Sequence, residues 1–201
     1  MATTHVHISE ECDLQFPLPE LTDDAFFSFC QENKDYRIER TAEGKIEIMP
    51  VTGGRTSHRN LELAMQVQLW ARADKRGLGF DSNGMFRLPS AAMRAPDVAW
   101  IERSRLASIS ERQKDRFIPL CPDFVIELAS PSDRLPTLQA KMCEWMENGC
   151  QLGWLIYPPT RSVYVYRGEN VEHLDSPDAI DGEGPVAGLR VDLALIWDPG
   201  W

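Results

Sequence analysis

Residues 124–133 read FVIELASPSD, an apolar run that only Glu127 interrupts before a polar turn begins. An unbroken apolar segment of this length is typical of a central strand that is covered on both faces of a sheet. Burying a carboxylate there costs free energy unless the group is paired or binds a cation. The segment therefore predicts the centre of the fold and supplies the first candidate site residue.

The segments on either side predict the rest of the domain. Thr22 can cap a helix in which Asp23 and Asp24 lie at the positive end of the dipole. Elsewhere, alternating apolar and polar residues predict strands, and apolar residues at helical spacing predict helices. The first expected elements are that helix, with Phe26, Phe27, Phe29 and Cys30 on its buried face, and a hairpin of strands 36–40 and 45–49. A long helix follows residues 50–58, with Leu61, Ala64, Met65, Leu69 and Trp70 at helical spacing. After it we expect strands 79–88 and 94–101, a helical or irregular segment 103–115, a helix 138–147, and a hairpin of strands 151–157 and 162–166. This order predicts an α/β fold with a mixed central sheet flanked by helices.

The composition is that of an ordinary folded chain. With 201 residues, of which 43% are hydrophobic and 26% charged, the chain can build one good core and is short for two domains. We expect an N-terminal arm over residues 1–21 and one domain over residues 22–201. No apolar run reaches the length of a membrane span, and the N-terminus lacks a secretory signal pattern. Five cysteines without a CxxC pair are typical of reduced thiols, so we expect a cytoplasmic protein.

The net charge limits the partners. At −10 it argues against a general nucleic-acid coat, so any contact with DNA would use a local basic face. Two groups of basic residues could form such a face, although solvated helix surfaces explain them equally well. The first group is Arg55, Arg59, Arg72, Lys75 and Arg76, and the second is Arg103, Arg105, Arg112, Lys114 and Arg116.

Several common catalytic motifs are absent from the sequence. It contains no Walker loop, no GxGxxG, HExxH or GxSxG segment, and no zinc-type pairing of Cys and His. These absences disfavour nucleotide hydrolases of the P-loop type, Rossmann dehydrogenases, zincins and α/β-hydrolases.

A second carboxylate, Asp97, lies in the apolar segment APDVAW at residues 95–100. If its strand neighbours that of Glu127, the two carboxylates repel, and a divalent cation relieves the repulsion. Hard oxygen ligands of this kind suit Mg²⁺ or Mn²⁺, which retain waters for chemistry on phosphate. The alternative is that Asp97 caps a turn after Pro96 and that Glu127 pairs with an arginine.

Four further residues are weaker candidates. Lys141 lies near the start of the helix after the Glu127 strand, where its ammonium could stabilise a phosphorane or orient a water, or extend to solvent. His58 could contact a phosphate or act as an acid or base, or simply cap or pack its helix. Glu39 and Glu47 share one face of the first hairpin, where they either add a carboxylate or face solvent.

Taken together, these segments resemble the Uma family of restriction-endonuclease-like proteins. That family is abundant in cyanobacteria and belongs to the PD-(D/E)XK nuclease-like superfamily. The resemblance covers about residues 36–166, with a weaker match in GLRVDLALIW near the C-terminus. The segments that carry it are EGKIEIMPVTGGRTSH (43–58), APDVAW (95–100), FVIELASPSD (124–133), Lys141 with Trp145 and the NGC turn (148–150), LGWLIYP (152–158) and VYVYR (163–167).

The resemblance implies a restriction-endonuclease-like fold in which Asp97 and Glu127 bind Mg²⁺ or Mn²⁺. The superfamily signature expects a lysine two residues after the glutamate, where this chain has Ala129. In this family the lysine comes from the following helix, here Lys141, and His58 matches the histidine position. The segment between the two carboxylates carries the basic insert 103–116, either a DNA-facing element or a surface excursion.

The implied function is Mg²⁺-dependent hydrolysis of DNA phosphodiester bonds. A homodimer fits that function, because cutting both strands of a duplex is easiest with two sites. One alternative is a catalytically inactive nuclease-like module that binds nucleic acid or protein. A third hypothesis is an acidic interaction protein whose buried charges form ion pairs only.

Overall fold

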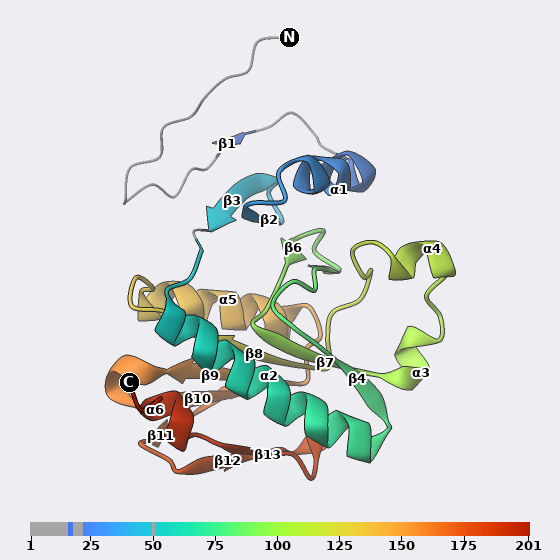
Figure 1. Cartoon of the computed structure of the whole chain (residues 1–201). Coiled ribbons are helices and arrows are strands. Elements are labelled where there is room, and N and C mark those ends of the chain that lie inside the picture. Colours follow the sequence, from blue (N-terminus) through green and yellow to red (C-terminus); the bar gives the residue numbers. More distant parts are fainter. Residues whose placement is uncertain (1–15, 18–21, 50) are drawn as a thin grey trace.

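A six-stranded mixed sheet lies at the centre of the computed structural model (Figure 1). Its strands run in the order β11-β10-β9-β8-β7-β4, and β8 and β9 are parallel while the other neighbours are antiparallel. The bounds are β4 (Gly77–Phe80), β7 (Val98–Glu102), β8 (Phe124–Leu128), β9 (Leu152–Tyr157), β10 (Ser162–Arg167) and β11 (Asn170–Asp175). Because parallel neighbours need a crossover, the helix α5 (Leu135–Glu147) connects β8 to β9. The expected central strand and the helix after it are confirmed.

A second sheet packs above one end of the first, in the order β1-β3-β2-β6-β5 (Figure 1). The bounds are β1 (Phe16–Pro17), β2 (Arg37–Arg40), β3 (Lys45–Met49), β5 (Phe86–Arg87) and β6 (Met93–Arg94). The expected first hairpin is confirmed, and Glu39 lies directly opposite Glu47 in its register. The structure describes residues 16–17, 22–49 and 51–201, so most of the expected arm over residues 1–21 lies outside the described residues.

Two strands that we expected to be continuous are each divided between the sheets. Residues 79–88 separate into β4 and β5 at a turn in which the Asp81 side chain accepts a hydrogen bond from the main chain of Asn83. Such local bonding competes with strand pairing. Residues 94–101 likewise separate into β6 and β7 at Pro96, which has no N–H to donate to a sheet.

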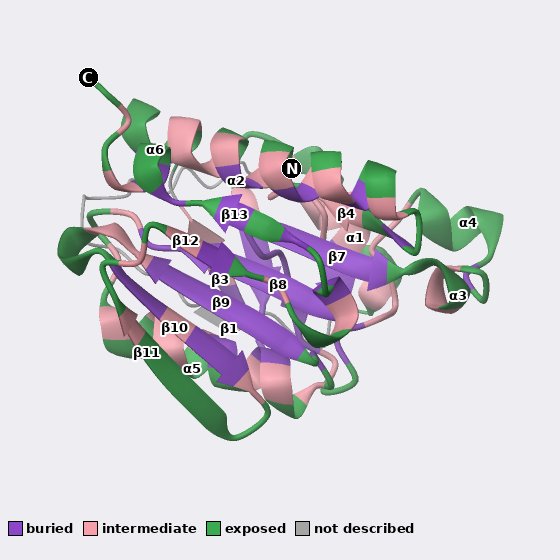
Figure 2. Cartoon of the chain, turned by 90° about the horizontal axis from the view of Figure 1, so that it is seen from below, coloured by how far each residue is buried: buried purple, intermediate pink, exposed green. Residues whose placement is uncertain are grey.

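The helix α2 (Gly54–Asp74) covers one face of the six-stranded sheet and α5 covers the other (Figure 2). Along β8 the side chains alternate accordingly: Phe124, Ile126 and Leu128 pack in the core on the α2 side. Val125 packs on the α5 side, so the same alternation points Glu127 toward α5. The buried side chains of the sheet form its two cores, one under each helix.

The packed face of α2 differs from the expected one. Three residues that we placed on the apolar face are exposed: Leu61 (66%), Met65 (45%) and Leu69 (59%). Two apolar rows of helical spacing coexist on this helix, and spacing alone does not tell which row the sheet covers. The buried row is Thr56, Leu63, Val67 and Ala71, with Ala64 and Trp70 packed partly against the same core.

The remaining elements are short. The helix α1 (Asp23–Glu32) begins as expected, because the Thr22 hydroxyl accepts a hydrogen bond from Ala25 N–H. The insert after β7 forms α3 (Arg103–Leu106) and α4 (Glu111–Lys114), and the chain closes with β12 (Ala179–Asp181), β13 (Arg190–Asp192) and α6 (Ala194–Trp197), with short 3-10 turns at Pro158–Thr160 and Gly184–Val186.

The cysteines and the helices of the described segments add two findings. Cys30, Cys121, Cys143 and Cys150 are free thiols, whereas Cys12 lies outside the described residues. No helix in the described part of the chain is both long and apolar enough to cross a membrane.

Candidate active site

Asp97 and Glu127 lie side by side on adjacent strands. Asp97 immediately precedes β7, and its main-chain N–H donates to the carbonyl of Ile126 at 3.1 Å. In return, the Leu128 N–H on β8 donates to Asp97 Oδ2 at 2.8 Å. Both carboxylates are buried, with 8% of Asp97 and 3% of Glu127 exposed. The sheet itself therefore holds two carboxylates together, as the apolar segments around them suggested.

Lys141 projects from α5 into this pair of carboxylates. Its Nζ lies 3.0 Å from Glu127 Oε1 and 3.2 Å from Glu39 Oε1, and it donates to the Ala95 carbonyl at 3.3 Å. One helical turn later, Trp145 Nε1 donates to the same Glu127 oxygen at 2.8 Å. The Lys141 ammonium is thus inside the protein and not extended to solvent.

Glu39, for which the sequence left open a further carboxylate or a solvent-facing position, lies inside the cluster. We weighed a solvent-facing position for it, and that position is wrong, because only 1% of Glu39 is exposed. Its Oε1 accepts hydrogen bonds from Lys141 and, at 3.1 Å, from Ala95 N–H. The alternation of β2 is the same as that of a half-exposed strand, and only the packing of the second sheet over α5 buries this side chain.

Two arginines that carried no sequence signal neutralise these carboxylates. Arg94 on β6 contacts Glu39 Oε2 at 3.1 Å and Glu144 of α5 at 2.6 Å, and it also pairs with the half-exposed Glu47. Arg37 on β2 donates to Asp97 Oδ1 at 3.4 Å and to the carbonyl of Ala95. Both sheets and α5 therefore meet in one network of buried ion pairs.

The amide of Asn60 on α2 contacts Asp97 from the opposite side of the sheet. Its Nδ2 donates to Asp97 Oδ1 at 3.1 Å, while its Oδ1 is buried and without a partner among the described residues. This residue also escaped the sequence analysis, since a lone asparagine within a helix carries no pattern.

The structure does not bring His58 to the other three candidates. No hydrogen bond or ion pair joins its imidazole to Asp97, Glu127 or Lys141, all of which lie in the described segments. His58 is half-buried, and the two-residue step to Asn60 turns the helix by about 200°. The face of α2 that carries Asn60 toward the sheet thus carries His58 away from it.

Burial and mutual charge set the protonation of the cluster. The pKa of Glu127 is raised to about 7, chiefly because the carboxyl is buried; Lys141 lowers this pKa, while Asp97 and Glu39 raise it. For Glu39 burial also raises the pKa, but Lys141 and the two arginines outweigh it and hold that pKa below its usual value. Burial lowers the pKa of Lys141, but Glu127 and Glu39 outweigh it, so the net shift is upward and the ammonium stays charged at neutral pH.

These side chains fit a hydrated divalent cation. Within the described part of the chain, no three His, Cys, Asp or Glu side chains converge closely enough to hold a metal ion by themselves. Mg²⁺ needs only one or two carboxylates, because it retains several of its waters. Lys141 and Trp145 both use Glu127 Oε1, which leaves Oε2 for another partner, and the unpartnered Asn60 Oδ1 is a second oxygen beside Asp97.

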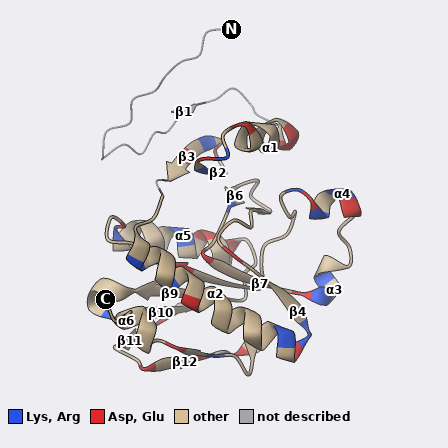
Figure 3. Ribbon diagram, in the orientation of Figure 1, with Lys and Arg blue, Asp and Glu red and all other residues tan. Residues whose placement is uncertain are grey.

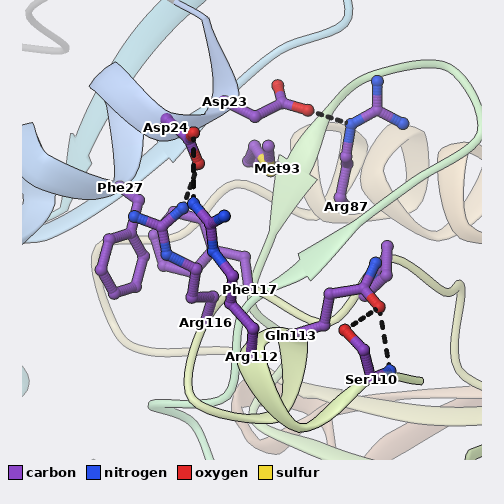
Figure 4. A pocket seen from close by; sticks show the side chains of 11 residues that line it. Asp23, Asp24, Phe27, Arg87, Met93, Ser110, Arg112, Gln113, Arg116 and Phe117 are labelled. Atoms are coloured by element: carbon purple, nitrogen blue, oxygen red, sulfur yellow. Dashed lines mark hydrogen bonds and ion pairs between the residues drawn. The ribbon is translucent and has the colours of Figure 1, made fainter.

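The basic insert 103–116 is neutralised largely within the protein (Figure 3). Arg105 pairs with the buried Asp123 at 2.5 Å, and Arg112 and Arg116 both pair with Asp24 of α1. The insert and α1 enclose a surface pocket of about 460 Å³ (Figure 4). Its lining includes neither carboxylate of the sheet nor Lys141, so the pocket is separate from the carboxylate cluster.

The first basic group is also partly engaged. At the start of α2, Arg55 donates to the carbonyl of Trp201 at 3.2 Å and Arg59 to that of Trp197 at 3.3 Å. These contacts tie the C-terminal segment to the N-terminal end of the helix that carries Asn60.

Comparisons with known proteins agree with this architecture. The family model described as "Uma2: Putative restriction endonuclease" matches residues 23–194. Among solved structures, a "putative nuclease belonging to DUF820" from Anabaena variabilis ATCC 29413 superposes with a TM-score of 0.67, at 24% sequence identity, over 80% of this chain and 89% of that chain. That likeness shows a shared fold, and no curated protein matches the chain. The chain, an α/β domain built on a mixed central sheet, belongs to the Uma2 family, described as putative restriction endonucleases.

Proposed function

We propose that this chain is a Mg²⁺-dependent nuclease that hydrolyses phosphodiester bonds of DNA. The observation that carries the proposal is the convergence of Asp97, Glu127 and Lys141 in one buried cluster. Two carboxylates from adjacent strands with a charged lysine between the sheet and a helix suit phosphate chemistry, because they combine a cation site with a fixed positive charge. The family match makes nucleic acid the substrate class.

Asp97 and Glu127 would hold the cation. When bound, the ion supplies positive charge against the phosphate and makes a nearby water more acidic. The protein fixes both carboxylates beforehand: the Leu128 N–H orients Asp97, and the Trp145 indole orients Glu127. Such bonds limit the reorganisation that would otherwise accompany catalysis.

Lys141 and Arg37 would act on the phosphate itself. The ammonium of Lys141 stays protonated at neutral pH, so it can donate to a phosphate oxygen whose negative charge grows in the transition state. Arg37 brings a second cation to Asp97 Oδ1. A guanidinium can bind phosphate with two parallel hydrogen bonds.

A second candidate function is a nuclease-like module that binds nucleic acid or protein without cutting. The observation in its favour is that Lys141 and Arg37 already pair with the carboxylates that would hold the cation. The net charge of −10 favours the same alternative, because it opposes general binding to DNA.

The deciding experiment is cleavage by the purified full chain. Supercoiled plasmid and end-labelled linear duplex are incubated with Mg²⁺ or Mn²⁺, and with EDTA, and compared with Asp97→Asn and Glu127→Gln. The matched control for loss of a carboxylate is Asp181→Asn, since the Asp181 side chain is 71% exposed. We expect metal-dependent cleavage by the wild type and the control only.

Two outcomes would overturn the proposal. One is full cleavage by both carboxylate variants, and the other is no cleavage by the wild type at millimolar metal. A gel shift that weakens steeply with salt, without cleavage, would support the binding module instead. Sedimentation of the same sample tests whether the active form is the homodimer that we expect.

A further inference from the structure

Two side chains that contact Asp97 each leave one buried polar atom without a partner. Four such atoms occur among the described residues, and two of them are Asn60 Oδ1 and Arg37 Nε. Both side chains use their other polar end to donate to Asp97 Oδ1, at 3.1 Å and 3.4 Å. A buried acceptor left unpaired costs about 1–3 kcal/mol, and such groups in a folded protein often mark a missing water, an ion or a catalytic role.

The orientation of the Asn60 amide is fixed by charge. Exchanging its oxygen and nitrogen would point a carbonyl oxygen at the carboxylate of Asp97, which accepts hydrogen bonds only. The unpaired Oδ1 therefore needs a donor, and no described residue supplies one. The donor to Asn60 Oδ1 must therefore be supplied by the ligand.

The backbone holds this amide in place. Asn60 lies one turn after the buried Thr56 and one turn before the buried Leu63, on the row of α2 that packs against the sheet. The backbone therefore directs the Asn60 side chain toward Asp97, whose Oδ1 accepts from Asn60 Nδ2 at 3.1 Å.

We propose that Asn60 is a positioning residue of the cation site, which rests on the proposed function. Its Nδ2 holds Asp97, and its Oδ1 accepts a hydrogen bond from a water in the hydration shell of a divalent cation. Mg²⁺ and Mn²⁺ bring such waters with them, and a carboxamide oxygen is a hard acceptor for their hydrogens. The ligand class is therefore a hydrated divalent cation, and Asn60 contributes to its affinity.

The test is Mn²⁺ affinity, measured by calorimetry on the metal-free full chain. Asn60→Leu removes both ends of the amide and should weaken Mn²⁺ binding about 10- to 100-fold, as loss of an outer-shell partner does elsewhere. Asn60→Asp keeps an oxygen acceptor and should bind Mn²⁺ at least as tightly as the wild type. The control is Gln66→Leu on the same helix, whose amide bonds only the main chain of Asp192, and its affinity should not change.

The two variants of Asn60 separate this role from a merely structural one. If Asn60→Asp, despite its added negative charge, weakens Mn²⁺ binding as much as Asn60→Leu, the oxygen acceptor contributes nothing and the proposal fails. Wild-type affinity in Asn60→Leu, or no Mn²⁺ binding by the wild type, would overturn it as well. If Asn60→Leu does not fold, Asn60→Ala takes its place with the same expectation.

The outcomes also distinguish this inference from the proposed function. Mn²⁺ binding that depends on Asn60 without any DNA cleavage supports the inference and overturns the nuclease. Cleavage by the wild type together with unchanged Mn²⁺ affinity in Asn60→Leu does the reverse.

Discussion

The two larger sheets carry buried charge in opposite ways. Within the strands of the six-stranded sheet, all of which the structure describes, Glu127 is the only buried charged residue. In the second sheet, two short strands bury three charges: Glu39, Arg40 and Arg94. Among the described residues, Glu127 of the first sheet has Lys141 as its one ion-pair partner, whereas Glu39 of the second sheet contacts Lys141 and two arginines.

The difference shows how the chain divides the work of the site. The apolar sheet raises the pKa of Glu127, because burial there is poorly compensated. The charged sheet lowers the pKa of Glu39, since Lys141, Arg37 and Arg94 all face it. Glu127 can thus exchange a proton for a metal cation near neutral pH, whereas Glu39 holds the positively charged side chains in place.

The largest expected effect comes from removing Glu39, the buried carboxylate of the second sheet. Glu39→Ala removes the buried carboxylate that Arg94 and Lys141 share, leaves Lys141 with Glu127 and Arg94 with Glu144 and Glu47, and should lower the free energy of unfolding by about 3 kcal/mol. Glu47→Ala, directly opposite in the hairpin register, removes a carboxylate whose side chain is 35% exposed and should cost less than about 1 kcal/mol. Urea denaturation of both variants makes the comparison, and equal losses would contradict it.

The next effect concerns the lysine between the sheets. Lys141→Met keeps the length of the side chain and removes the charge, so DNA cleavage should fall about 10²- to 10³-fold. The control is Lys114→Met, because Lys114 pairs at the surface with the exposed Glu111. Cleavage rates at saturating Mg²⁺ measure the effect, and an unchanged rate in Lys141→Met would remove the ammonium from the proposed chemistry.

A third effect concerns Glu127 of the six-stranded sheet and is seen in how the stability of the protein depends on pH. The pKa of Glu127 is about 7 in the folded chain against an ordinary value of 4.5, so the folded state binds the extra proton. The loss of stability caused by ionising buried Glu127 is therefore absent below pH 4.5, grows as the pH rises to 7, and reaches roughly 3 kcal/mol above that. In metal-free buffer, Glu127→Gln should be more stable than the wild type at pH 8 and lose that advantage by pH 4.5. Parallel stability curves for the two proteins across this range would show that burial does not perturb Glu127.

The smallest effect tests where the core of the six-stranded sheet ends. Leu61→Ala should change the free energy of unfolding by less than about 0.5 kcal/mol, because that side chain is 66% exposed on α2. Leu63→Ala, two residues later and fully buried, should cost several times more. Thermal melts of the two variants decide between the observed helix face and the one we expected from spacing.

The same contrast explains how far the sequence could predict the site. Asp97 and Glu127 could be found because a carboxylate stands out in an apolar strand. For Glu39 the sequence left both alternatives open, since a charged residue that alternates with apolar ones has the pattern of a half-exposed strand whether or not another layer covers it. Lys141 was found through the family resemblance, as Ala129 occupies the position where the signature expects it.

The fold divides in the same way. Local signals were sufficient for the Thr22 cap, the first hairpin and the segment from β8 to β9, because each is stabilised by neighbours in sequence. The separation of residues 79–88 between two sheets and the packed face of α2 depend on distant contacts, which periodicity does not contain.

The crossover from β8 through α5 to β9 has a consequence for the order of folding. Glu127 and Lys141 belong to this one supersecondary unit, so their encounter closes only a short loop. Glu39 is 102 residues from Lys141 and can arrive only after a much larger loop has closed. We therefore expect the ion pair between Lys141 and Glu127 to form early in folding. The second sheet, which carries Glu39, should then pack late against this pair.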